Sequence, residues 1–215
     1  MAISKQTPAV KITVGDQYIC KNVMDSGNNW TETFESDVIE LPTVVNVEVT
    51  DNSDSYETYA SGAVYDSDTP VTSQDIAEEN VAFPTMLLAE LRGETVDSDG
   101  VTLGGGFGIR PFFAYGMAIK RKDGSWEFRW YPKCKLITNT DKTETSEDSH
   151  KDQNEEITIR AYGYNDNGNT YIRCLTSEEG MEDMTAAAFF AAPLLTVADV
   201  KGALPTTTTT TTTTP

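Results

Sequence analysis

Apolar and polar side chains alternate with a period of two along much of this chain. Val10, Ile12 and Val14 are separated by polar residues, and the same alternation recurs over residues 45–49 and 157–161. Successive side chains of a β-strand point to opposite faces, so each run predicts a strand with one packed face and one face in water. The pattern therefore predicts a mainly β protein, built as a sandwich or a barrel.

The clearest predicted hairpin covers residues 112–131 and turns at Asp123-Gly124. An Asp-Gly pair favours a two-residue type I′ turn, because both positions need positive φ angles. Such a turn sets Lys120 opposite Glu127 as an exposed ion pair. It also places two apolar pairs on one face of the hairpin: Ile119 with Phe128, and Met117 with Trp130.

A second hairpin is predicted around Asn167-Gly168. Its register would form two pairs: Tyr164 with Tyr171, and Tyr162 with Arg173. Residues 141–156 lie between the two hairpins and contain seven acids, two lysines and almost no apolar side chain. We expect this segment to form a long exposed loop.

Short helices are predicted at two places. Residues 84–93 begin with a proline that suits a first helical turn, carry a leucine stripe and end in a glycine; the stripe is Leu87, Leu88 and Leu91. A second short helix is predicted over residues 196–201. The chain closes with Pro205, nine threonines and Pro215. We therefore expect one β domain over residues 1–204 and an extended low-complexity tail over 205–215.

Residue types that carry catalysis or bind metals are sparse. The single histidine, His150, lies in the acidic segment, whereas a catalytic base needs packed neighbours that orient it. Zinc needs three or four cysteine or histidine ligands, and Cys20, Cys134 and Cys174 are scattered without CxxC spacing. We expect reduced cysteines, no metal, no cofactor and no enzymatic activity.

Charge is the most informative part of the composition. The formal net charge is −18, which argues against a protein that grips nucleic acid. Residues 37–99 contain 15 acids and one base, whereas residues 120–135 contain six bases and two acids. This separation is compatible with two solvated faces, or with a contact in which the basic hairpin of one copy meets an acidic stretch of the next. Contacts between two different patches build rings or filaments.

Nothing in the sequence predicts export or membrane insertion. The first residues lack the apolar core of a secretion signal, and the longest apolar run, residues 186–195, is shorter than the roughly 20 residues that span a bilayer. We expect a soluble chain that is not exported.

Residues 111–136 read PFFAYGMAIKRKDGSWEFRWYPKCKL, and this block resembles the major tail proteins of long-tailed, non-contractile phages (siphophages) of Gram-positive hosts. In that family a Tyr-Gly strand, a hairpin and a Tyr-Pro-Lys-Cys-type strand follow one another. A polar Thr/Glu/Ser stretch and a further strand come next, matched here by residues 143–156 and 157–163. The similarity covers about residues 5–200, and the threonine tail departs from it.

The resemblance implies a tail-tube-type β-sandwich or barrel with a flanking helix. It also implies hexameric rings that stack into a hollow tube, whose inner strands join into one barrel and whose bore carries genomic DNA into the host. The implied partners are further copies of the chain and other tail proteins such as the tape measure, terminator and distal tail proteins. The implied location is the virion tail, assembled in the host cytoplasm, with DNA in transit but not specifically bound.

A bore lined with acids would repel phosphates, whereas lysines would bind them. We therefore expect acids from the acidic half of the chain to line the channel: Asp66, Asp68, Asp75, Glu78 and Glu79, with Glu48 and Glu57 as alternates. We expect Glu144, Glu147 and Asp148 to contact the neighbouring ring. The basic Lys133 and Lys135 are expected at a contact between subunits.

Two other functions are open at this stage. An all-β module that binds carbohydrate or cell surfaces would suit exposed aromatic residues and a Thr/Pro stalk, and it is disfavoured if Trp126 and Trp130 are buried. An enzyme is disfavoured by the single histidine.

Overall fold

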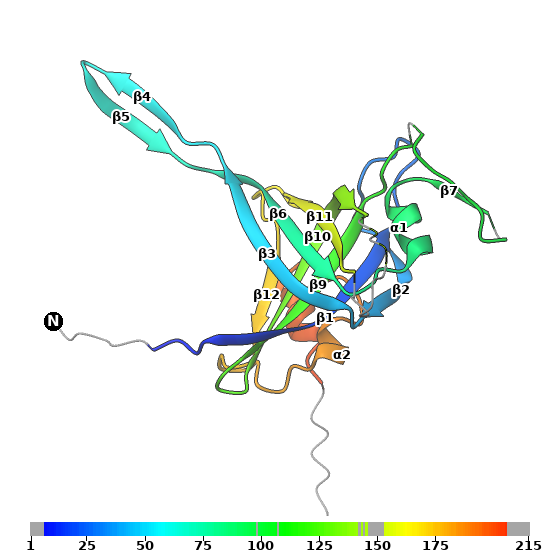
Figure 1. Cartoon of the computed structure of the whole chain (residues 1–215). Coiled ribbons are helices and arrows are strands. Elements are labelled where there is room, and N and C mark those ends of the chain that lie inside the picture. Colours follow the sequence, from blue (N-terminus) through cyan, green and yellow to red (C-terminus); the bar gives the residue numbers. More distant parts are fainter. Residues whose placement is uncertain are drawn as a thin grey trace, which may run out of the picture.

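The computed structural model is mainly β, as the alternating pattern predicts (Figure 1), and it describes residues 7–97, 99–106, 108–141, 143, 145 and 153–205. The strands are β1 (Lys11–Asn22), β2 (Phe34–Leu41), β3 (Val44–Ser53), β4 (Tyr56–Ala60), β5 (Ala63–Asp68), β6 (Val71–Asn80), β7 (Thr95–Val96), β8 (Thr102–Leu103), β9 (Phe113–Arg121), β10 (Trp126–Thr140), β11 (Glu155–Tyr162) and β12 (Ile172–Leu175). The helices are α1 (Thr85–Leu91), α2 (Ala186–Phe189) and α3 (Val197–Gly202).

One large antiparallel sheet organises the described residues. Its order is β2-β1-β9-β10-β11-β6-β3, and β12 also pairs with β10. The long strand β10 has two partners in succession on the edge opposite β9: its first part pairs with β12 and its second part with β11. Register shifts interrupt β1 between Val14 and Gln17 and β10 between Tyr131 and Cys134. Such irregularities bend strands, so the sheet curls until β3 lies next to β1.

The curled sheet separates two apolar cores. The core inside the curl contains Ile76 of β6 and Tyr115 of β9, and the leucines of α1 cover part of it. The core on the other face contains Trp130 of β10 and is covered by Phe189, Phe190 and Val200 of the C-terminal helical segment. The central strand β9 is therefore buried on both faces, which explains its near-continuous apolar sequence.

The first predicted hairpin exists, but its predicted register is wrong by one residue. Gly124 has φ +87°, the Arg121 N–H donates to the Ser125 carbonyl, and the Arg121 carbonyl accepts from the Gly124 N–H, so the loop has three residues rather than two. Lys120 therefore lies opposite Trp126, and Glu127 lies opposite Ile119. A slip of one residue moves every partner to the other face, which removes the predicted Lys120–Glu127 pair.

The slip also separates the apolar residues that were predicted to share one face. Met117 and Ile119 face the core inside the curl, whereas Phe128 and Trp130 face the core beneath the C-terminal helices. Because both faces of this hairpin are buried, the apolar pattern is compatible with either register, and turn geometry decides between them.

The second predicted hairpin is wrong, although its turn forms. Gly168 has φ +72° and donates to Asn165, and Tyr164 donates to Asn169. The strands on either side then diverge: β11 pairs with β6 and with the second part of β10, and β12 pairs with the first part of β10. Although β11 and β12 are neighbours in the chain, they do not pair with each other. Each pairs with a different part of β10.

The two predicted helices are confirmed. In α1 the three leucines are buried and Gly93 follows with φ +71°; in α3 Thr196 forms a capping box with Asp199. The short helix α2 has no counterpart among the predictions. All three cysteines are free and buried. Most of the predicted acidic loop, with His150, and the threonine tail lie outside the described residues. In the described part of the chain, no helix has the length and apolarity needed to cross a membrane.

Candidate functional surfaces

The strands β4 and β5 form an arm, residues 54–70, that projects from the body of the molecule (Figure 1). Its tip is Ser61-Gly62, both with positive φ, as a tight hairpin turn requires. Every residue of β4 and β5 is exposed, and Tyr65 keeps 79 % of its surface in water. The arm carries four acids and no base: Asp54, Glu57, Asp66 and Asp68.

A second acidic surface lies on the outer face of β3 and β6. The register sets Glu48 opposite Ala77, Thr50 opposite Asp75 and Asn46 opposite Glu79, so Glu48, Asp75 and Glu79 share that face. Asp75 accepts two hydrogen bonds from Arg160, at 2.6 and 2.8 Å, and this pairing holds the pKa of its carboxyl below the usual range. Glu79 accepts a bond of 2.7 Å from the Asn154 amide.

Glu78 lies on the opposite face of β6 and is only 3 % exposed, which excludes it from a surface that lines a channel. It points into the core inside the curl, near Asn80 and Tyr115. Its Oε1 atom and the Tyr115 hydroxyl have no hydrogen-bond partner among the described residues, and Asn80 reaches its Oε2 at 3.4 Å. Burial raises the pKa of Glu78 to about 7, although the polar groups of Tyr115 and Asn80 oppose the shift.

The acids proposed from sequence thus occupy three separate places. Glu57, Asp66 and Asp68 lie on the arm, Glu48, Asp75 and Glu79 lie on the outer sheet face, and Glu78 lies in the core. The proposed contact residues Glu144, Glu147 and Asp148 lie outside the described residues.

Lys133 and Lys135 lie on one face of β10 among aromatic rings. The Lys133 ammonium is 5.3 Å from the ring centre of Trp30, and the Lys135 ammonium is 4.0 Å from that of Phe112. The Trp30 indole N–H donates to the carbonyl of Pro132. Cation–π contacts of this kind hold both ammonium groups in place at a half-exposed surface.

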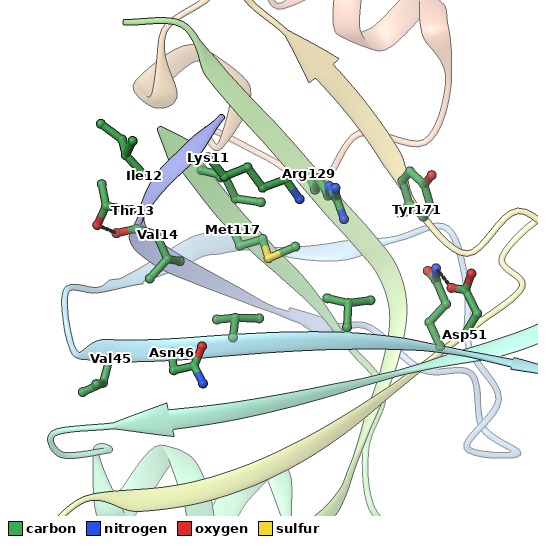
Figure 2. A pocket seen from close by; sticks show the side chains of 14 residues that line it. Lys11, Ile12, Thr13, Val14, Val45, Asn46, Asp51, Met117, Arg129 and Tyr171 are labelled. Carbon is green, nitrogen blue, oxygen red and sulfur yellow. Dashed lines mark hydrogen bonds between the residues drawn. The ribbon is translucent and has the colours of Figure 1, made fainter. Parts of the chain in front are cut away.

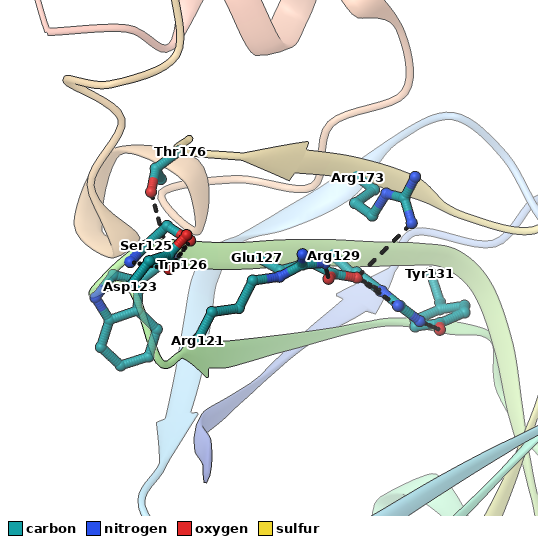
Figure 3. A network of polar contacts seen from close by, with 9 residues as sticks. All are labelled: Arg121, Asp123, Ser125, Trp126, Glu127, Arg129, Tyr131, Arg173 and Thr176. Atoms are coloured by element: carbon teal, nitrogen blue, oxygen red, sulfur yellow. Dashed lines mark hydrogen bonds and ion pairs between the residues drawn. The ribbon is translucent and has the colours of Figure 1, made fainter. Parts of the chain in front are cut away.

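A buried charge network surrounds Glu127 (Figure 3). Its fully buried carboxylate pairs with Arg121 and Arg129, and Arg173 lies 3.9 Å away. Burial by itself would raise the pKa of Glu127, but the hydrogen bonds from Arg121 and Arg129 outweigh burial and hold it below the usual value. This network was not predicted, because an acid between basic residues on an alternating strand is typical of an exposed position.

An open groove of about 610 Å³ lies between the N-terminal part of β1 and the strand β3 (Figure 2). Apolar side chains of both strands and of β9 form its walls, among them Val14, Val47 and Ile119. Lys11 and Arg129 bring positive charge to it. The groove was not predicted, because it exists only where β1 extends beyond its pairing with β2 and where, among the described residues, β3 has no hydrogen-bonded strand on the side facing β1.

These surfaces offer charged and apolar side chains for contacts with other molecules. Within the described residues, no group of three or more His, Cys, Asp or Glu side chains is placed to hold a metal ion. Burial raises the pKa of the Cys20 thiol to about 11 and holds that of Cys134 well above its usual value, which disfavours the reactive thiolate.

This chain is similar to known proteins only at the level of solved structures, with low sequence identity. No protein-family model matches the chain, and no curated protein matches it. One similar structure is a chain of the sheath–tube complex of an extracellular contractile injection system, PVC, in the extended state, with 12 % identity over 73 % of this chain and 87 % of that chain and a TM-score of 0.36. Another is a chain of the baseplate of the anti-feeding prophage, with 7 % identity over 79 % and 97 % and a TM-score of 0.39. Likeness at these scores carries no argument about function.

Proposed function

We propose that this chain is the tube subunit of a phage tail, polymerising as stacked hexameric rings around a channel for genomic DNA. The proposal combines the sequence resemblance over residues 111–136 with a mainly β structure whose prominent surfaces offer charge and strand edges. In this role the chain is structural and performs no catalysis.

The observation that carries the proposal is the free edge of β3. Among the described residues, β3 is a ten-residue strand that pairs with β6 alone, and the projecting arm continues from its end. A long unpaired edge is an aggregation hazard for a monomer, and closure of a sheet across copies removes it. A ring in which each copy completes the sheet of the next therefore fits this fold.

We further propose that the outer face of β3 and β6 lines the channel through Glu48, Asp75 and Glu79. The two strands carry no lysine or arginine, and the guanidinium of Arg160 on the adjacent strand β11 is paired with Asp75, so phosphates passing this face would meet mainly carboxylates. Asp66, Asp68 and Glu57 remain candidates only if the arm turns toward the bore. Glu144, Glu147 and Asp148 are proposed at the contact between rings, and Lys133 and Lys135 at a contact between subunits.

The sequence resemblance further suggests the kind of phage to which this tube subunit belongs: a long-tailed, non-contractile phage of a Gram-positive host. The tape measure, terminator and distal tail proteins are then the expected partners, and the virion tail is the expected location. The competing carbohydrate-binding module has less support, because Trp130 is fully buried and bonds through its indole N–H to Phe189, while Trp126 is half-buried.

Negative-stain microscopy of the concentrated full chain tests the proposal. We expect rings with sixfold symmetry and hollow tubes. A protein that stays monomeric at high concentration, also when mixed with tail proteins that nucleate assembly, would refute it. Retention on a glycan array by such a monomer would favour the binding module.

A further inference from the structure

The arm of residues 54–70 lacks the support that a two-stranded hairpin needs. An isolated hairpin is marginal in water, and stability requires more strands or a surface to pack against. Here three tyrosines and a valine are exposed along it: Tyr56, Tyr59, Val64 and Tyr65. Side chains of this size on a bare hairpin indicate a contact surface.

The groove between β1 and β3 has the complementary properties. Its rim exposes apolar side chains, with Ile12 57 % and Val45 47 % in water, and among the residues that the structure describes no strand pairs with the edges of β1 and β3 that face the groove. Its charge is positive, because Lys11 and Arg129 line it and the neighbouring network holds three arginines around the single carboxylate of Glu127. The lining contains one acid, Asp51, which accepts a hydrogen bond from Gln74 and keeps its charge, so the two cations of the lining exceed it by one.

We propose that the β4–β5 arm of one copy docks in the groove between β1 and β3 of a second copy. The two surfaces are complementary in charge, because the arm has four acids and no base and the groove is cationic. They are also complementary in apolar surface, because exposed tyrosines of the arm would contact exposed valine and isoleucine of the groove. The arm projects away from the body of its own chain, so the acceptor belongs to another molecule (Figure 1).

This contact joins two different surfaces, so each copy can insert its arm into one neighbour and accept the arm of another neighbour in its groove. Such a heterologous contact propagates into a closed ring or an open filament. The inference deepens the proposed function, because it names the contact through which tube subunits associate, yet it is testable on any oligomer that the chain forms.

Cysteine cross-linking tests the contact directly. The native cysteines are buried, so single cysteines placed at Tyr65→Cys on the arm and at Ile12→Cys in the groove are the accessible thiols in two separately purified copies of different length. With a short bismaleimide, we expect a mixed pair between the two copies at concentrations where the wild type associates. Val197→Cys, on a similarly exposed residue of α3, is the matched control for the groove position.

Charge reversal supplies the second measurement. Lys11→Glu or Asp66→Lys alone should weaken self-association at least tenfold in sedimentation velocity, and the double variant should recover part of the loss. Lys201→Glu and Asp166→Lys are exposed controls that should change little. Circular dichroism checks that each variant is folded.

The outcomes separate this inference from the proposed function. If tubes form but cross-linking to Ile12→Cys does not exceed that to Val197→Cys, the arm–groove contact is refuted and the tube proposal stands. If the arm and groove cross-link in oligomers that never form rings or tubes, the contact stands and the tube proposal fails. Equal weakening by the exposed controls would also overturn the contact.

Discussion

Glu78 and Glu79 are neighbours in sequence and lie in opposite environments. Glu79 faces outward and accepts a hydrogen bond from Asn154, whereas Glu78 is buried beside Tyr115, and one of its carboxyl oxygens has no hydrogen-bond partner within the described part of the chain. The titratable side chains acting on Glu78 from other strands are Tyr115 and, through charge, Cys134, and neither is cationic. Its environment therefore favours the neutral carboxylic acid.

This environment predicts a pH dependence of stability. Unfolded Glu78 titrates near 4.5 and folded Glu78 at about 7, so the folded state binds the proton more tightly and stability falls as pH rises from about 4.5 to 7. Once the pH is above 7, the free energy of unfolding has fallen by an amount on the order of 3 kcal/mol. We expect Glu78→Gln to raise the melting temperature at pH 8 and to flatten the pH dependence. Glu79→Gln is the control, and an equal response from it would contradict the assignment.

Glu127 illustrates the opposite case of a buried acid kept ionised by its partners. We expect Glu127→Ala to cost about 3 kcal/mol in denaturant unfolding at pH 7, because Arg121 and Arg129 would lose their counter-charge in a mostly buried place. Lys120→Ala should cost less than about 1 kcal/mol, since Lys120 only lies over the Trp126 ring. Similar losses in the two variants would favour the predicted two-residue turn over the observed three-residue loop.

At the scale of elements, the end of α1 depends on one backbone position. Gly93 has φ +71°, and a β-carbon built there would lie 2.4 Å from the carbonyl oxygen of Ile109. Gly93→Ala should therefore destabilise the protein by about 2 kcal/mol or more in thermal or denaturant unfolding. Gly202→Ala, at the end of α3 where a β-carbon meets open space, should be tolerated. A tolerated Gly93→Ala would mean that the loop carrying Ile109 adjusts freely.

The β10 strand shows how one element organises several others. Because it pairs with β9 on one edge and with β12 and then β11 on the other, its register positions both cores and the Glu127 network. The local patterns predicted the strands on either side of Asn167-Gly168 but not their partners. Partner choice depends on contacts between residues far apart in the chain, which local alternation does not encode.

At the scale of the whole molecule, the proposed channel face predicts an effect of charge on DNA. Replacing Glu48 and Glu79 by lysine should leave tubes assembled but slow DNA release from particles, because phosphates would gain counterion-release affinity at the wall. The slowing should diminish at higher salt. Glu178→Lys with Glu179→Lys, on an exposed turn, is the control. Unchanged release kinetics would remove β3 and β6 from the channel wall.

The basic face of β10 predicts an effect on assembly. Lys133→Glu with Lys135→Glu should impair polymerisation in light scattering while circular dichroism reports a folded monomer, because an acidic partner surface would be repelled. Lys122→Glu, at the exposed hairpin loop, changes charge without touching the aromatic rings around Lys133 and Lys135. Normal tubes from the Lys133/Lys135 variant would place the contact elsewhere.

Local chemistry was enough to predict much of this protein. The mainly β class, the strands at 45–49 and 157–161, the helix before Gly93 and the buried Trp130 all follow from period, turn residues and side-chain size, which act over a few residues. The outward Glu48 follows from the same alternation, since it occupies a polar position between Val47 and Val49.

Other features arise only when distant segments meet. Glu78 is buried because one face of β6 points to the inside of a curled sheet, and Glu127 is held ionised because the loop at Gly124 brings Arg121 beside it, next to Arg129 of its own strand. The groove beside Lys11 exists because the first residues of β1 extend beyond its pairing with β2. The arm is exposed because β4 and β5 extend past the sheet. Burial and pairing depend on the free energy of the whole packed arrangement, so no short stretch of the chain specifies them.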